Sequence, residues 1–286
     1  EVIGAKKNLS HVEIPEYVDY VDFLLRFRVT SIGDKAFRKY SKLIDIQIAN
    51  SVKSIGDEAF YGCSSLPEIY IPEGVTSIGD KTFYGCFSLY DIYIPEGVTS
   101  IGDSAFYDCY SLESVDIPNS VTSIGNDAFC FCSRLQSVTI PNSVTDIGYA
   151  AFSYCYSLTS IVIPNSVQYL GARSFYNCYS MEYVQLGTGL TSIGEDAFAG
   201  CSSLRQITIP GNVKRIGQGA FRQCTSLEKV AIKNGVVSIG REAFRGCENM
   251  TVIAIPATVM TIENDAFSGC KNLKAIVVPS GKKAHF

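Results

Sequence analysis

Apolar positions recur along the chain with a constant spacing of 23 residues. The isoleucine of a Ser-Ile-Gly triplet returns once per unit, and a leucine takes its place in one unit. A strict short period predicts a solenoid, in which one coil buries its apolar face only by stacking on copies of itself. The eleven positions of this column are Ile32, Ile55, Ile78, Ile101, Ile124, Ile147, Leu170, Ile193, Ile216, Ile239 and Ile262.

The first half of each unit predicts a strand. Ile69 and Ile71 stand on either side of one outward position, and this alternation is typical of a strand. Pro72 follows at once, and because proline cannot donate to a ladder, the strand is expected to end there. Val75 and Ile78 are the next inward positions, along a second extended stretch.

The second half of each unit predicts a corner and a short turn. Gly79 is expected to give the corner a permissive backbone. Asp80 has the chemistry of an N-cap, and it predicts a single helical or 3₁₀ turn that carries Phe83 and Cys86 inward.

The repeated unit Ile-Pro-x-x-Val-Thr-Ser-Ile-Gly-x-x-Ala-Phe-x-x-Cys-x-Ser-Leu resembles the BspA-like leucine-rich repeats, also called Treponema pallidum-type, of bacterial surface proteins. The resemblance covers about residues 25–279. It implies a right-handed leucine-rich-repeat coil with a parallel β-sheet on the concave face. It also implies a secreted or cell-surface location and a role in binding or adhesion.

The register divides the chain into three parts. Eleven repeats are expected over residues 25–281, followed by a short tail at 282–286. Residues 1–24 break the register and predict a capping or truncated coil. The chain contains no run of 18 apolar residues, so the sequence predicts no membrane-spanning helix.

Charge is distributed unevenly. The net charge is −4, but residues 54–200 carry 16 acidic and 3 basic groups, whereas residues 201–286 carry 12 basic and 5 acidic groups. Drift of solvated faces explains this pattern, and so does a surface that steers a charged partner. The acidic balance, and a basic third without aromatic platforms, argue against a nucleic-acid partner.

The eleven cysteines predict neither disulfides nor a metal site. Ten of them occupy one repeat position, where a small buried filler is expected, and their parallel Cβ directions suit a disulfide poorly. No Cys-x-x-Cys motif or histidine partner supports metal binding. Cys130 lies outside this column and is predicted to be the most reactive or exposed thiol. The column contains Cys63, Cys86, Cys109, Cys132, Cys155, Cys178, Cys201, Cys224, Cys247 and Cys270.

The sequence predicts no enzyme and no cofactor. His11 and His285 are the only histidines, and the chain has no nucleophile elbow, phosphate loop or dinucleotide fingerprint. A pair of carboxylates placed for glycoside hydrolysis is the one catalytic alternative left open.

The positions that vary between repeats are the candidates for function. In the early repeats the outward strand positions are aromatic and acidic, a combination suited to binding, although cross-strand pairing of Tyr70 with Tyr93 is the alternative. The candidate ligand-binding residues are Glu68, Tyr70, Tyr90, Asp91, Tyr93, Asp116 and Tyr183.

A second aromatic set lies around the Phe and Cys turns. Stacking between adjacent coils explains it, and so does a partner surface. All 17 tyrosines fall between Tyr17 and Tyr183, an asymmetry that stacking alone leaves unexplained. The members of this set are Tyr84, Tyr107, Tyr110, Tyr156 and Tyr179.

Three hypotheses of function follow. The first is adhesion to a protein of a host or microbial surface, favoured by a mixed aromatic and acidic face. The second is carbohydrate binding, favoured if the tyrosines stack on sugar rings. The third is a structural spacer that presents another domain.

Overall fold

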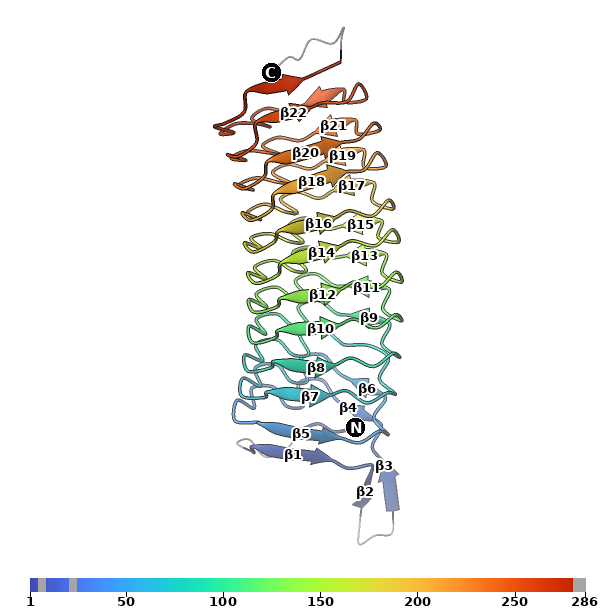
Figure 1. Ribbon diagram of the computed structural model, residues 1–286. Coiled ribbons are helices and arrows are strands. Elements are labelled where there is room, and N and C mark those ends of the chain that lie inside the picture. The colour runs from blue at the N-terminus through green and yellow to red at the C-terminus, as the bar shows by residue number, and fades with distance from the viewer. Residues whose placement is uncertain (5–8, 21–24, 280–286) are drawn as a thin grey trace.

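Each 23-residue unit forms one coil, and the coils stack along a single axis (Figure 1). The computed structural model describes residues 1–4, 9–20 and 25–279. The predicted solenoid of parallel strands is confirmed, because residues 23 apart pair in register, as in Tyr70 with Tyr93 and Ile69 with Ile92. Within the described residues, no helix could cross a membrane.

Two rows of strands run along the stack. The first row, which we call the strand face, comprises β1 (His11–Ile14), β5 (Asp45–Ile48), β7 (Glu68–Tyr70), β8 (Asp91–Tyr93), β10 (Ser114–Asp116), β12 (Ser137–Thr139), β14 (Ser160–Val162), β16 (Tyr183–Gln185), β18 (Gln206–Ile209), β20 (Lys229–Ile232), β22 (Val252–Ala254) and β24 (Ala275–Val277). The second row comprises β4 (Ser31–Ile32), β6 (Ser54–Ile55), β9 (Ser100–Ile101), β11 (Ser123–Ile124), β13 (Asp146–Ile147), β15 (Tyr169–Leu170), β17 (Ser192–Ile193), β19 (Arg215–Ile216), β21 (Ser238–Ile239) and β23 (Thr261–Ile262).

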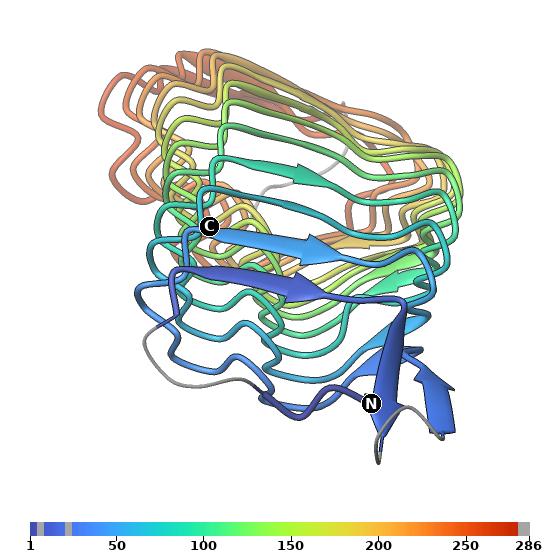
Figure 2. The ribbon, with the colours of Figure 1, turned by 90° about the horizontal axis from the view of Figure 1, so that it is seen from below.

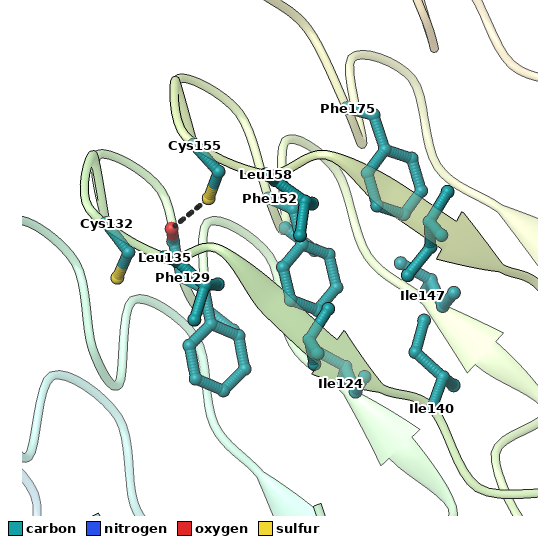
Figure 3. Packing of buried hydrophobic residues seen from close by; sticks show 14 of the residues in the cluster. Ile124, Phe129, Cys132, Leu135, Ile140, Ile147, Phe152, Cys155, Leu158 and Phe175 are labelled. Carbon is teal, nitrogen blue, oxygen red and sulfur yellow. Dashed lines mark hydrogen bonds between the residues drawn. The ribbon is translucent and has the colours of Figure 1, made fainter. Parts of the chain in front are cut away.

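The core is a set of columns rather than a single centre. Phe129, Phe152 and Phe175 stack on one another between columns of buried isoleucine and leucine (Figure 3). From Phe37 to Phe267 the ring centroids of successive coils lie 5.0–5.7 Å apart. This spacing is close to the distance of about 4.8 Å between neighbouring strands, so side chains and backbone share one repeat distance.

The cysteine column is buried, as predicted, but its thiols also form hydrogen bonds. The Cys155 Sγ donates to the carbonyl oxygen of Phe129 at 3.3 Å (Figure 3). Each of the ten thiols makes the same contact with the phenylalanine 26 residues earlier, at 3.1–3.3 Å. All eleven cysteines are free.

The prediction of an exposed or reactive thiol at Cys130 is wrong. The residue is only 3% exposed, and burial raises the pKa of its thiol to about 12. Because a thiolate is the reactive form, this thiol is less reactive than an ordinary cysteine.

The predicted helical or 3₁₀ turn is also wrong. Within the described residues this segment is a series of hydrogen-bonded turns, with left-handed backbone at Lys81 (φ 54°) and Gly85 (φ 68°). The N–H groups of Lys81, Phe83 and Gly85 donate to carbonyls of the next coil. Those of Tyr84 and Cys86 donate to carbonyls three residues back. The backbone therefore alternates between closing its own turn and joining the neighbouring coil.

Asp80 does not cap its own turn. Its Oδ1 accepts a hydrogen bond from the backbone N–H of Asp103, 23 residues away, at 2.8 Å. The short acidic or amide side chain is selected because it links two coils. The same bond is made by Asp34, Asp57, Asp103 and Asn126.

The corner glycines are required by close packing rather than by backbone freedom. A Cβ placed on Gly125 would lie 2.6 Å from the carbonyl carbon and 2.7 Å from the carbonyl oxygen of Gly102 in the preceding coil. The φ of Gly125 lies outside the left-handed region. The expected need for a permissive backbone at Gly79 is wrong in the same way, because its φ lies outside the left-handed region and a Cβ there would lie too close to Asp57 Oδ1 in the preceding coil.

A hairpin extends beyond the first coil at the N-terminal end (Figures 1 and 2). Its strands β2 (Tyr17–Tyr20) and β3 (Leu25–Arg28) are antiparallel. Ile14 pairs with Ile48, 34 residues away rather than 23, so the hairpin accounts for the break in register. We propose that this hairpin belongs with the cap, which places the start of the regular coils after Arg28. The predicted tail, 282–286, lies outside the described residues.

Candidate binding surface

Tyr70 and Tyr93 form the centre of the predicted surface. They project outward from β7 and β8, and their rings stack with centroids 5.1 Å apart at 3°. Despite this contact, Tyr70 is 52% exposed and Tyr93 is 43% exposed. The cross-strand pairing expected as an alternative is therefore present, and it leaves much of both residues open.

Glu73 holds the two hydroxyl groups. The Tyr93 hydroxyl donates to Glu73 Oε1 at 2.8 Å, and the Tyr70 hydroxyl lies 3.5 Å from the same oxygen. The hydrogen bond to Glu73, followed by burial, raises the pKa of Tyr93. Stacking and the shared carboxylate together fix the directions of both rings.

Carboxylates surround this tyrosine pair. Glu68 and Asp91 are register partners on β7 and β8, and Asp116 follows on β10. Tyr90 precedes β8 and is half-exposed. We call these residues the acidic-aromatic patch: Glu68, Tyr70, Tyr90, Asp91, Tyr93 and Asp116.

Tyr183 lies apart from the acidic-aromatic patch. It projects from β16, and β12 and β14 separate β16 from β10. Its hydroxyl contacts Gln185 Oε1 at 3.0 Å. The structure thus brings together six of the seven candidate residues, all except Tyr183.

The second aromatic set forms short stacks rather than one stripe. Tyr84 lies between Tyr61 and Tyr107, with ring centroids 4.8 and 4.6 Å away. Tyr110 stacks on Phe87 at 5.4 Å. Tyr156 stacks on Tyr179 at 5.1 Å. The five predicted residues of this set all make ring contacts, so stacking between coils accounts for their positions.

Cys130 interrupts the longest of these stacks. It occupies the ladder position that follows Tyr107, where no ring is available. The next residue, Phe131, meets Tyr107 at 61° and stacks on Tyr154 at 4.3 Å, so the aromatic contacts continue by a shifted route. Burial raises the pKa of Tyr107 to about 12.

A hollow of about 830 Å³ on the strand face was missed by the sequence prediction. It extends over β16, β18, β20 and β22, with Tyr183 among its lining residues. Thr208, Ala231 and Ala254 line it with short side chains. The signal was present in the sequence, because the outward column becomes small in these coils, at Thr208, Ala231 and Ala254.

Among the described residues, no group of three or more His, Cys, Asp or Glu side chains could hold a metal. His11 Nδ1, at the start of β1, lies 3.0 Å from Oγ of the preceding Ser10, and both residues are exposed. His285 lies outside the described residues. What these surfaces offer chemically is contact area, hydrogen bonds and charge.

Parallel coils with a period of 23 residues and columns of buried leucine and isoleucine define a leucine-rich-repeat solenoid. The chain belongs to the BspA-type leucine-rich-repeat family, whose six-copy repeat model matches residues 30–159 and 145–274. The resemblance seen in the repeated unit is therefore confirmed.

Two solved structures with TM-scores above 0.5 show the same fold, and a third is similar in sequence. A leucine-rich repeat protein from Eubacterium ventriosum ATCC 27560 is 22% identical with a TM-score of 0.60, covering 96% of this chain and 86% of that one. The pneumococcal vaccine antigen PcpA is 20% identical with a TM-score of 0.54, over 96% and 73%. A leucine rich cell surface protein from Faecalibacterium prausnitzii A2-165 is 27% identical with a TM-score of 0.48, over 96% and 89%. No curated protein matches.

Proposed function

We propose that this chain is a non-catalytic recognition protein, secreted or held at the bacterial cell surface, that binds a protein of a host or microbial surface. The binding surface is the acidic-aromatic patch on β7, β8 and β10. The observation that carries this proposal is the Tyr70–Tyr93 pair, which remains about half exposed although its rings are stacked and its hydroxyls are held by Glu73. Membership of the BspA-type leucine-rich-repeat family supports the location.

Held tyrosines favour binding for an energetic reason. Tyrosine gives a large contact area with a hydrogen-bonding tip, and it is enriched at the energetic centres of interfaces. Immobilising a free side chain on binding costs about 0.5–1.5 kcal/mol. Because Tyr70 and Tyr93 are already fixed, most of this cost is absent when a partner binds.

Charge points to a basic partner. Glu68, Asp91 and Asp116 surround the tyrosines, and residues 54–200 carry a net charge of −13. Such a field raises the association rate of a positively charged partner and weakens with added salt.

Ring geometry favours a protein over a sugar as the partner. A sugar that stacks on tyrosine needs an open ring face. In the Tyr70–Tyr93 stack the two facing surfaces cover each other, so each ring has at most one face left for a sugar. Carbohydrate binding and a spacer role are alternative outcomes of the following experiment.

The test is a binding panel of extracellular-matrix proteins and glycans, applied to the wild type and to Tyr70→Ala/Tyr93→Ala. A partner of the patch should bind the double variant at least about tenfold more weakly, because truncation of a central tyrosine typically costs more than about 1 kcal/mol. The matched control is Tyr169→Ala, because Tyr169 is 55% exposed on the other strand row.

Circular dichroism melting first establishes that both variants fold. Equal binding by wild type and double variant would contradict a role for the patch. If the wild type binds no member of the panel, the result would favour the spacer hypothesis instead.

A further inference from the structure

A polar notch of about 340 Å³ lies among the turn segments, away from the strand face. It is formed by residues of four successive coils. Its lining residues are Tyr176, Asn177, Ala199, Gly200, Arg222, Gln223 and Arg245.

The notch lies where small residues stand between larger ones at two adjacent repeat positions: Ala199 between Tyr176 and Arg222, and Gly200 between Asn177 and Gln223. Tyr176 occupies the ladder position that holds tyrosine in earlier coils, and Arg222 and Arg245 occupy it in later ones. Between them the position holds Ala199, which is buried, followed by Gly200 with a left-handed backbone. The missing side chains leave a gap between a tyrosine and two arginines.

One buried and one partly buried carboxylate hold the arginines in place. Asp196 has a side chain only 7% exposed, and its Oδ1 lies 3.0 Å from Arg222 Nη2. Glu242 is 13% exposed, and its Oε2 lies 3.2 Å from Arg245 Nη1 and 4.0 Å from Arg222 Nη1. These contacts orient both guanidinium groups before any ligand arrives, which lowers the entropy cost of binding.

Positive charge exceeds negative charge around the notch. Arg173 also pairs with Asp196 at 3.6 Å, and Arg241 also pairs with Glu242 at 3.6 Å. Four arginines therefore share two carboxylates. Residues 201–286, which include three of these arginines and Glu242, carry a net charge of +7 in total, and this attracts anions over a longer range.

We propose that this notch binds one acidic sugar unit, meaning a sugar ring that carries a sulfate or carboxylate group. The planar donors of Arg222 and Arg245 match the oxygens of such an anionic group. The amides of Asn177 and Gln223 suit sugar hydroxyls, and Tyr176 offers ring surface and a hydroxyl. A volume of about 340 Å³ is at the low end of small-molecule sites, which span about 300–1,000 Å³, and exceeds the size of a bare oxyanion.

The test is isothermal titration of the folded protein with glucose 6-sulfate and with glucuronic acid, beside glucose and sodium sulfate. The notch predicts binding of at least one acidic sugar more tightly than either glucose or free sulfate. Ala199→Tyr should weaken that binding more than tenfold, because it fills the gap and leaves every arginine in place. This substitution suits the fold, since tyrosine occupies the same ladder position in other coils.

A second variant tests the charge. Arg245→Gln should weaken binding of the acidic sugar about tenfold, whereas Arg205→Gln, an exposed arginine that does not line the notch, should leave it unchanged. The proposal is overturned if neither acidic sugar binds, if glucose or free sulfate binds as tightly, or if folded Ala199→Tyr binds like the wild type. These results are independent of the acidic-aromatic patch.

Discussion

At the scale of single residues, the buried cysteines do more than fill space. The carbonyl oxygen of Phe83 accepts the N–H of Cys86 at 3.1 Å and also the thiol of Cys109 at 3.1 Å. One oxygen thus closes a turn in its own coil and receives a donor from the next. Alanine at this position would leave a void and remove that donor, and the two losses account for the choice of cysteine in ten coils.

Tyr107 should lower the unfolding free energy of the protein at alkaline pH. Burial raises its pKa to about 12, whereas tyrosine in an unfolded chain titrates near 10. The folded protein therefore holds this proton more tightly, so the contribution to stability is complete below about pH 10 and is lost as the pH rises through about 12. We expect Tyr107→Phe to reduce the loss of unfolding free energy between pH 10 and 12, measured by urea denaturation.

The control for this prediction is neutral pH. Phenylalanine retains a ring that can stack on Tyr84, so the variant should unfold at nearly the same urea concentration as the wild type at pH 7. Identical pH profiles for the two proteins between pH 10 and 12 would show that Tyr107 does not titrate as its burial requires.

At the scale of elements, the turn segments work as connectors between coils. Non-glycine residues there adopt left-handed backbone, as at Lys81 (φ 54°) and Asp108 (φ 62°). Such conformations cost about 1 kcal/mol or more each. The N–H groups of both residues donate to the next coil, so hydrogen bonds across the stack stabilise a backbone that a single coil would not keep.

Gly125 should be intolerant of even one added methyl group. The new Cβ would lie 2.6–2.7 Å from backbone atoms of Gly102, and this backbone cannot move without separating two coils. We expect Gly125→Ala to lower the unfolding free energy by about 3 kcal/mol or more, which is the range of severe core strain. Chemical denaturation measures the change.

Gly74→Ala is the matched control. The three atoms nearest to a Cβ at Gly74 all belong to the Lys53 side chain, which can rotate away. This variant should stay within about 0.5 kcal/mol of the wild type. Equal losses at the two positions would mean that the backbone preference of glycine, and not contact between coils, determines the cost.

The sequence predicts elements well where the signal lies within one coil. Ile69 between Glu68 and Tyr70 shows the period of a strand, and the structure has that strand. The turn at Asp80 could not be derived in the same way. An aspartate before a turn has the chemistry of an N-cap, and nothing local reveals that its acceptor serves a residue 23 positions away. The prediction of an exposed thiol at Cys130 was wrong for a related reason, because the burial of this residue depends on neighbouring coils.

At the scale of the whole molecule, the features that do not repeat are separated along the stack. The acidic-aromatic patch lies on β7, β8 and β10, whereas the notch and the hollow lie among later coils. The column of small outward residues and the Ala199–Gly200 pair were visible in the sequence. Whether small residues form a depression depends on how far the side chains of adjacent coils project, which only the structure gives.

A solenoid should lose a whole coil more easily than part of one. Deletion of residues 138–160 removes one period of 23 residues, so every downstream column stays aligned with its upstream copy. Each coil contacts only its neighbours, and stability is approximately a sum over coils and interfaces. We expect this variant to fold with the same far-ultraviolet circular dichroism shape and a single cooperative thermal transition.

Deletion of residues 138–159 removes 22 residues and is the sharper comparison. A slip of one residue exchanges inward and outward positions in a strand, so the downstream strand would turn Ile161 outward and its exposed neighbours inward. We expect this variant to melt at lower temperature or to aggregate, although it retains one residue more. Comparison of the two deletions tests why the period is constant. Equal stability of the two variants would mean that the loops absorb the slip. Lower stability of the 22-residue deletion would mean that register between columns holds the molecule together.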